Sequence, residues 1–328
     1  IFITSIFLSG INNWNDEILS NKFLFSALFF FIFLNEIKSK RQLKQILYLL
    51  FASSIVASIY GLYQYFFLGF NRVKGFSFSL TFGNMVAVMI IFLSVYIVWG
   101  NFNYKIKSSL VLINISFIAN LIFTQSRGAW LGFIGGAFFL SLVKSKKVVI
   151  FLLLIIIFSF ILLPTQYINR FKSSFDISYD LKNNRSNTLR IEMWKTAIEI
   201  MKDYPVFGLG YDNYRTPIAD SYKTDAINRD RFIHVHNSFL QFGAELGLLG
   251  LFSFLYLMLL ILKKIFIFYK KNDNNIKLFH LSSIITILIY FIQGMTQYNF
   301  GKTEPLSFFW IIIALNFLIN KYQLLVND

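Results

Sequence analysis

Cysteine is absent from this 328-residue chain, and charged residues make up only 14% of it. Without thiols the chain has no structural disulfides and no thiolate metal sites. Acidic residues are also few, 16 against 31 basic ones, which gives a formal net charge of +15. Such a charge on a soluble protein would suggest nucleic-acid binding, but an excess of Lys and Arg is also typical of cytoplasmic loops in membrane proteins.

Apolar residues dominate instead: 56% of the chain is hydrophobic, 19% is aromatic, and the mean hydropathy is +0.59. This is too apolar for an ordinary soluble domain. Several continuous runs approach the ~20 residues that cross a bilayer as a helix, whereas a membrane β-barrel would show short alternating segments. We therefore predict an all-α, polytopic transmembrane bundle with nine full spans and the remnant of a tenth. The remnant is expected at residues 1–9 and the spans near residues 22–37, 44–69, 78–99, 108–124, 128–143, 147–163, 238–262, 278–298 and 304–320.

The basic residues of the short loops divide into two sets that alternate along the chain. The larger set contains Lys38, Lys40, Arg41, Lys44, Lys105, Lys107, Lys144, Lys146, Lys147, Lys263, Lys264, Lys270, Lys271 and Lys277. The opposite set contains only Arg72, Lys74, Arg127 and Lys302. Because positive loops stay in the cytoplasm, the larger set predicts the inner side. Residues 165–237 then lie outside, and the C-terminus lies inside.

We expect one membrane domain in three parts: N-terminal helices over 1–164, an extracytoplasmic loop over 165–237, and three C-terminal helices over 238–328. The loop contains an amphipathic helix that Ser186 or Asn187 would cap and Pro205 would end. Its apolar face would consist of Leu189, Met193, Ala197, Ile200 and Met201. Residues 208–214 (GLGYDNY) read as a turn. The chain opens at Ile1 inside an apolar stretch, so we expect it to lack its true N-terminus.

Four residues of the predicted outer side are candidates for chemistry. His236 comes just before an apolar run, and an imidazole at a water–lipid boundary can exchange a proton near neutral pH. Arg72, Arg127 and Arg190, the last in the first turn of the loop helix, are exceptions to the charge bias, and guanidiniums can grip a diphosphate in forked geometry. The alternatives are a histidine that only marks a helix start and arginines that anchor lipid headgroups.

Three motifs in order give the sequence a resemblance to a known family. The first is residues 124–132 (TQSRGAWLG). The second is residues 190–197 (RIEMWKTA) followed by 204–210 (YPVFGLG). The third is His236-Asn237 followed, nine residues later, by 247–251 (GLLGL). This set, over roughly residues 70–320, resembles the O-antigen ligase and O-antigen polymerase family of integral membrane glycosyltransferases.

The resemblance implies an enzyme that moves a glycan from undecaprenyl diphosphate to an acceptor hydroxyl, lipid A-core in a ligase, at the periplasmic face of the inner membrane. The reaction would be inverting and would need no cofactor, neither a metal nor a nucleotide sugar. By motif, His236 would be the general base, with a pKa near 7, and Arg72, Arg127 and Arg190 would bind the diphosphate. Arg215 and His234 would be secondary candidates.

Other functions stay open at this stage. A polymerase of the same family would join glycan repeats, and another relative would glycosylate protein; the motifs do not separate these. A lipid-linked glycan transporter is a different class, and it should carry ionisable residues at mid-membrane depth. Such residues are nearly absent from the predicted spans, and His280 reads as an interfacial residue, which favours a surface enzyme. Nucleic acid is not an expected partner.

Overall fold

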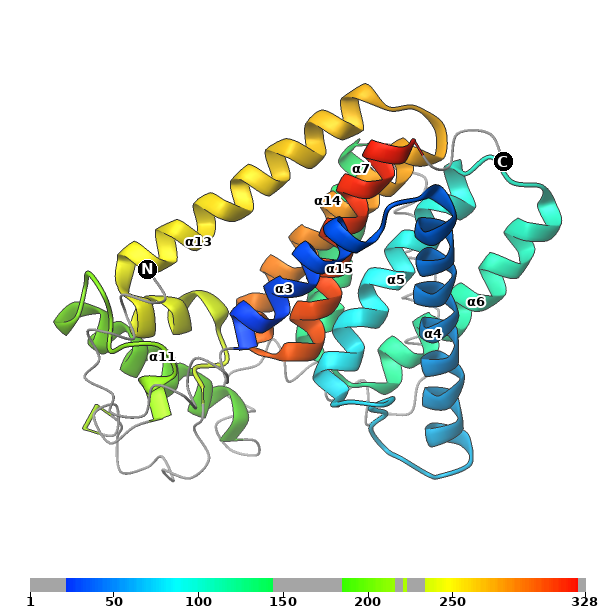
Figure 1. Cartoon of the computed structure of the whole chain (residues 1–328). Coiled ribbons are helices and arrows are strands. Elements are labelled where there is room, and N and C mark those ends of the chain that lie inside the picture. The colour runs from blue at the N-terminus through cyan, green and yellow to red at the C-terminus, as the bar shows by residue number, and fades with distance from the viewer. Residues whose placement is uncertain (1–21, 144–184, 216–220, 223–233, 324–328) are drawn as a thin grey trace. The chain divides into compact units, whose positions relative to one another are not determined.

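The computed structural model describes residues 22–143, 185–215, 221–222 and 234–323 (Figure 1). Within these residues every regular element is a helix. The helices are α3 (Lys22–Glu36), α4 (Lys40–Phe66), α5 (Ser79–Trp99), α6 (Tyr104–Phe123), α7 (Arg127–Val143), α11 (Arg185–Asp203), α13 (Ser238–Lys271), α14 (Asn274–Gly294) and α15 (Thr303–Tyr322), with 3-10 turns η1 (Asn213–Arg215) and η3 (Asn299–Gly301).

Six of these helices, α4, α5, α6, α13, α14 and α15, are long and apolar enough to cross a membrane, and α3 and α7 are shorter apolar helices. Eight of the nine predicted spans therefore coincide with described helices. The span at 147–163 and the remnant at 1–9 lie outside the described residues, so the count of nine stays a prediction. The all-α, multi-pass membrane fold is confirmed.

The chain divides into two compact units. Unit 1 comprises residues 1–22, 169–261 and 294–302, and unit 2 comprises residues 23–168, 262–293 and 303–328. In unit 2, α5 is the most enclosed of the six long apolar helices and packs against α4, α6, α7 and α15. Polar side chains join its helices, as expected where apolar faces alone would not distinguish protein from lipid.

The contact between α4 and α6 shows how such polar side chains work. Asn120 of α6 donates through Nδ2 to the backbone oxygen and the hydroxyl of Ser58, each at 2.9 Å. Gly61 lies one turn further along α4, and a Cβ there would collide with the Asn120 amide. The two helices therefore approach closely because one contributes a small residue and the other an amide that bonds to the partner backbone.

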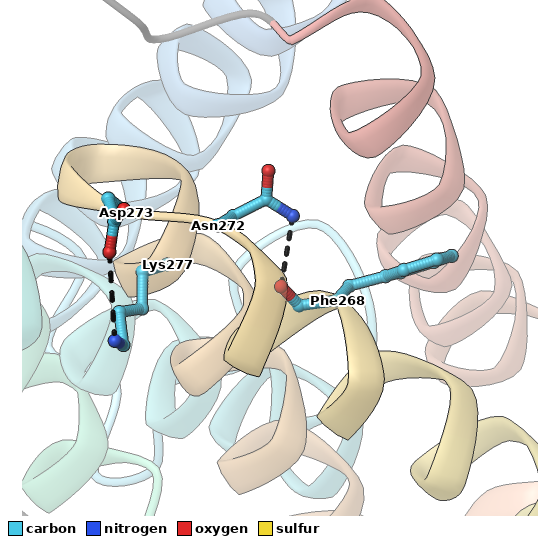
Figure 2. A network of polar contacts seen from close by, with 4 residues as sticks. All are labelled: Phe268, Asn272, Asp273 and Lys277. Carbon is cyan, nitrogen blue, oxygen red and sulfur yellow. Dashed lines mark hydrogen bonds and ion pairs between the residues drawn. The ribbon is translucent and has the colours of Figure 1, made fainter.

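The connection between α13 and α14 is shorter than the sequence predicted. Helix α13 continues to Lys271 instead of ending near 262, and α14 begins at Asn274 instead of 278. Figure 2 shows the contacts that tie the bend: the Asn272 Nδ2 donates to the Phe268 carbonyl at 2.9 Å, and Lys277 pairs with Asp273 at 3.9 Å. The extra turns of α13 are rich in lysine. The apolar stems of these long side chains allow the helix to continue beyond its apolar run while the charges reach water.

In unit 1 the predicted apolar face of α11 is confirmed. The buried cluster on this face joins α11 to the turn after it and to the start of α13; its members are Met193, Ala197, Ile200, Leu209, Tyr214, Val235 and Ala244, with Leu189, Trp194, Met201, Tyr222 and Leu240 packed against them. The helix begins at Arg185, so the predicted caps Ser186 and Asn187 are already helical, and Arg190 lies in the second turn. There the opposing effect of the helix dipole is weaker than in the first turn.

Helix α13 is broken at Gly247, whose backbone angles are φ 68° and ψ −175°. The turn 204–210 docks on this break. Leu209 and Gly210 donate their amides to the carbonyls of Ala244 and Glu245, at 2.9 and 2.8 Å. In return the amides of Leu248 and Leu249 donate to the carbonyls of Pro205 and Val206, at 2.7 and 3.3 Å. The turn thus pairs backbone groups that the break leaves without a partner inside the helix, which is how a broken helix is tolerated in a membrane protein.

Both glycines at this contact are required by geometry. A Cβ on Gly247 would fall against the Val206 carbonyl, and a Cβ on Gly208, whose φ is 67°, would fall against the Glu245 backbone. The predicted turn at 208–214 is confirmed, and its glycine content follows from this close approach.

Gly247→Ala is expected to undock the turn and lower the unfolding temperature. A side chain in this glycine-only region costs roughly 1–3 kcal/mol before any clash. Gly69→Ala is the matched control, because Gly69 has a φ of 66° but no atom lies within 4 Å of the position that its Cβ would take. Thermal unfolding in detergent should show a clearly larger loss for Gly247→Ala than for Gly69→Ala. Equal losses would mean that the docking contact contributes little.

Candidate functional site

His236 lies at the end of a short segment that is fixed on both sides. The Val235 amide donates to the Gln241 side-chain oxygen at 2.7 Å, so the first turn of α13 reaches back to the residue before the histidine. The Asn237 side-chain oxygen accepts from the amides of Phe239 and Leu240, at 3.0 and 3.1 Å, and caps the helix. The His-Asn pair of the third motif thus has a local explanation, since Asn is among the best helix-capping residues.

The backbone of His236 is left-handed, with a φ of 55°. A non-glycine residue in this region is uncommon, although histidine is among the residues enriched there, and such residues cluster at functional sites. The His234 ring lies 4.2 Å from the His236 ring, centroid to centroid, and 5.8 Å from the Tyr298 ring. His234, predicted as a secondary candidate, therefore lies beside the candidate base.

Burial, and after it the positive charges of Arg190 and Lys302, together lower the pKa of His236 to about 4. The expectation of a pKa near 7 is therefore wrong for the protein without substrate. The cause is that the imidazole is partly withdrawn from water and faces two cations, both of which disfavour its protonated form. At neutral pH the ring is unprotonated, as a general base must be.

Arg72 and Arg127 lie in unit 2, where the loop before α5 contacts the turn before α7. Arg72 Nε donates to the Thr124 carbonyl at 2.8 Å, and the Val73 amide donates to the Phe123 carbonyl at 3.0 Å. The Gln125 side-chain amide donates to the Asn71 carbonyl at 2.7 Å. The loop before α5 and the turn before α7 are thus joined, which brings Arg72 to the segment that leads into Arg127, the first residue of α7.

Gln64 of α4 holds this loop and was not predicted. Its buried side chain accepts from the amides of Lys74 and Gly75, each at 3.0 Å, and donates to the Gly75 carbonyl at 2.8 Å. Gly75 has a φ of 57°, and a Cβ there would press on the Phe82 ring. A neutral amide inside an apolar run gives no charge signal, so the sequence offered only its polarity as a clue.

Other predicted residues have different places. Arg215 is the last residue of η1, and its side chain lies outside the described residues. His280 is fully buried in α14, and its Nδ1 lies 2.8 Å from the Asn316 side-chain oxygen of α15. Its interfacial depth in the membrane stays a prediction. Among the described residues, no group of three or more His, Asp or Glu side chains is placed to hold a metal ion.

Glu245 is an ionisable residue buried within an apolar helix, with 1% of its surface exposed. Its side-chain oxygen accepts from the Tyr214 backbone amide at 3.3 Å. Burial, together with the Glu245 charge, raises the pKa of Tyr214 well above its ordinary value. Glu245 therefore belongs to the docking contact between α13 and the segment that follows α11.

The fold and these polar segments define a multi-pass membrane protein with a candidate site made of histidine and arginine. Residues 111–255 match the family model described as O-antigen ligase. This match contains Arg127, Arg190 and His236, whereas Arg72 and Lys302 lie outside it. The resemblance to the O-antigen ligase family is thereby confirmed.

Individual relatives agree with this resemblance. The chain is similar to an uncharacterized protein of Haemophilus influenzae, 29% identical over 285 residues, which cover 79% of this chain and 70% of that protein. It is similar to a putative polysaccharide ligase of Rickettsia typhi, 35% identical over 99 residues, which cover 29% of this chain and 22% of the relative. A putative polysaccharide ligase of Rickettsia felis is 27% identical over 146 residues, which cover 42% of this chain and 34% of the relative. The aligned stretches thus span about a third or less of these Rickettsia proteins, and the names support a ligase-type function.

Gln64→Leu is expected to loosen the loop that carries Arg72, because it removes three buried hydrogen bonds and leaves the loop backbone groups unpaired. Hydrogen exchange at the amides of Lys74 and Gly75 should rise by about tenfold or more. Gln45→Leu on the exposed side of the same helix is the control. Unchanged exchange in Gln64→Leu would show that the loop is held by other contacts.

Proposed function

We propose that this protein transfers a glycan from undecaprenyl diphosphate to an acceptor hydroxyl, with His236 as the general base. The acceptor oxygen attacks the anomeric carbon while the bond from that carbon to the diphosphate oxygen breaks. The hydroxyl proton passes to His236, and the leaving diphosphate keeps the bonding electrons. Attack from the face opposite the leaving group inverts the anomeric configuration.

The observation that carries the proposal is the state of His236. The imidazole is neutral at physiological pH, its backbone is held by the Asn237 cap and the Val235–Gln241 bond, and Arg190 is near enough for its charge to act on the ring. A fixed, unprotonated imidazole beside a cation suits proton abstraction next to an anionic leaving group.

Arg72 and Arg127 of unit 2, and Arg190 of unit 1, would each be diphosphate-binding residues. The bond from Arg72 Nε to Thr124 fixes the plane of its guanidinium, so that less conformational entropy is lost when it grips a phosphate. Fixed cations in a site shielded from water stabilise the charge that develops on the leaving group. In this proposal they do the work that a metal ion does in other glycosyltransferases.

The acceptor we propose is lipid A-core, at the periplasmic face of the inner membrane. The bias of basic residues between loops supports that orientation. The names of the Rickettsia relatives favour a ligase over a polymerase. The buried Glu245 is weak support for a transporter. Its side chain accepts a hydrogen bond from the Tyr214 backbone, and the residue lies only two turns into α13, away from the middle of the helix.

His236→Ala and His236→Asn are both expected to reduce glycan transfer by about 10²-fold or more, the usual contribution of a general base. Asn tolerates the left-handed backbone, so it separates loss of the imidazole from strain at this position. Transfer is measured in proteoliposomes that contain the full-length protein, a lipid-linked oligosaccharide and lipid A-core. Membrane insertion and unfolding temperature should stay near wild type for His236→Asn, and full transfer by that variant would refute the base role.

The pH dependence should differ between kcat/KM and kcat. With the free-enzyme pKa of His236 lowered to about 4, kcat/KM should stay level from pH 7 to about 5 and fall below that, as the imidazole becomes protonated. A bound diphosphate offsets nearby positive charge, so the acidic limb of kcat should lie at higher pH. An acidic limb of kcat/KM near the ordinary histidine value of 6.5 would contradict this electrostatic description.

A further inference from the structure

The segment between α14 and α15 is held against the start of α13 within unit 1. Ser238, the first residue of α13, donates to the Gln297 carbonyl at 3.0 Å and bonds to the Asn299 side-chain oxygen at 2.9 Å. Phe300 is fully buried, and its ring lies edge-on to that of Phe254 at 4.9 Å. Hydrogen bonds and packing thus fix the segment to a helix that begins two residues after His236.

Lys302 ends this segment and is partly exposed. Its ammonium is one of the two charges that act on the His236 imidazole, the other being Arg190 of α11. The rings of His234 and Tyr298 complete the described surroundings of the histidine pair. Lys302 is also one of only four basic residues in the predicted outer short loops. The charge pattern of the loops therefore singled it out, although none of the three motifs includes it.

We propose that Lys302 is a substrate-binding cation of the His236 site and binds an anionic group of one of the two substrates. The proposal rests on the proposed function and adds a residue that lies outside the matched family region. The anionic group is either a phosphate of the lipid-linked donor or a charged group beside the acceptor hydroxyl.

Two physical arguments support this role. Arg190 and Lys302 are both positive and both act on the same imidazole, so an anion bound beside His236 is attracted by both cations. The anchoring of residues 297–300 also fixes the backbone that leads to Lys302 before substrate arrives, which reduces the entropy lost on binding. A lysine is a compact point charge, so it suits a single phosphate or carboxylate oxygen more than a forked contact.

The test compares Lys302→Gln, Lys302→Arg and a control, Lys202→Gln, which removes an exposed cation from the last turn of α11 in the same unit. Binding of undecaprenyl diphosphate to the full-length protein in nanodiscs gives the donor arm. The acceptor KM at saturating donor gives the acceptor arm. Loss of one charge-assisted hydrogen bond should raise either the diphosphate dissociation constant or the acceptor KM of Lys302→Gln by about tenfold or more. Lys302→Arg should recover part of this loss, and the control should change little.

The acidic limb of kcat/KM is a further measurement that a purely structural role would not move. Removing the Lys302 charge should shift this limb to higher pH in Lys302→Gln and leave it in place in Lys302→Arg. A weaker affinity for undecaprenyl diphosphate identifies the donor as the source of the anion, and a raised acceptor KM identifies the acceptor as its source.

The proposal is overturned if Lys302→Gln leaves the diphosphate dissociation constant unchanged and also leaves the acceptor KM unchanged, or if the arginine variant loses as much binding as the glutamine variant together with a lower unfolding temperature. Failure of the proposed function gives a different result. In that case the wild-type protein transfers no glycan, and the diphosphate arm alone decides whether Lys302 binds the anion.

Discussion

The exchange of backbone hydrogen bonds between the turn 204–210 and the break in α13 is the contact on which the site in unit 1 depends. It pairs two carbonyls and two amides that the break at Gly247 removes from the helix. The same contact fixes the end of α11 relative to the start of α13. Arg190 is on α11 and His236 directly precedes α13, so these uncharged hydrogen bonds and the apolar cluster on α11 together position the cation relative to the imidazole.

Neutral polar side chains position the charged ones throughout the described part of the protein. Gln64 holds the loop of Arg72, Gln241 and Asn237 hold the segment of His236, and Asn299 holds the segment that leads to Lys302. Amides suit this task in an apolar protein, because they bond to backbone groups in both directions without the desolvation cost of an ion.

The sequence was sufficient to predict the helices, because each depends on a continuous apolar run that the bilayer requires. It also predicted the apolar face of α11 and the turn with two glycines. It did not predict that this turn repairs a broken helix, since Gly247 inside an apolar run looks like any other small residue. Helix ends were displaced for a similar reason: lysine stems extend α13, and capping preferences at α11 are weaker than its tertiary packing.

For the candidate site, motif positions gave His236 and the arginines, while their neighbours required the structure. Gln64 bonds to backbone groups 10 and 11 residues further along the chain, and Ser238 bonds to residues 59 and 61 further along, so no helical pattern in the sequence reports these bonds. The lowered pKa of His236 likewise depends on Arg190 and Lys302, which are 46 residues before it and 66 after it in the printed numbering. Electrostatic surroundings of this kind are a property of the folded chain.

The broken helix has a consequence for biosynthesis. The turn 204–210 precedes α13 in the chain, so it is synthesised before this helix enters the bilayer. Until the two meet, the segment around Gly247 carries open backbone dipoles that hydrocarbon cannot solvate. Lipid therefore disfavours full insertion of α13 until the turn 204–210 has docked on it, which couples the folding of unit 1 to the membrane insertion of this helix.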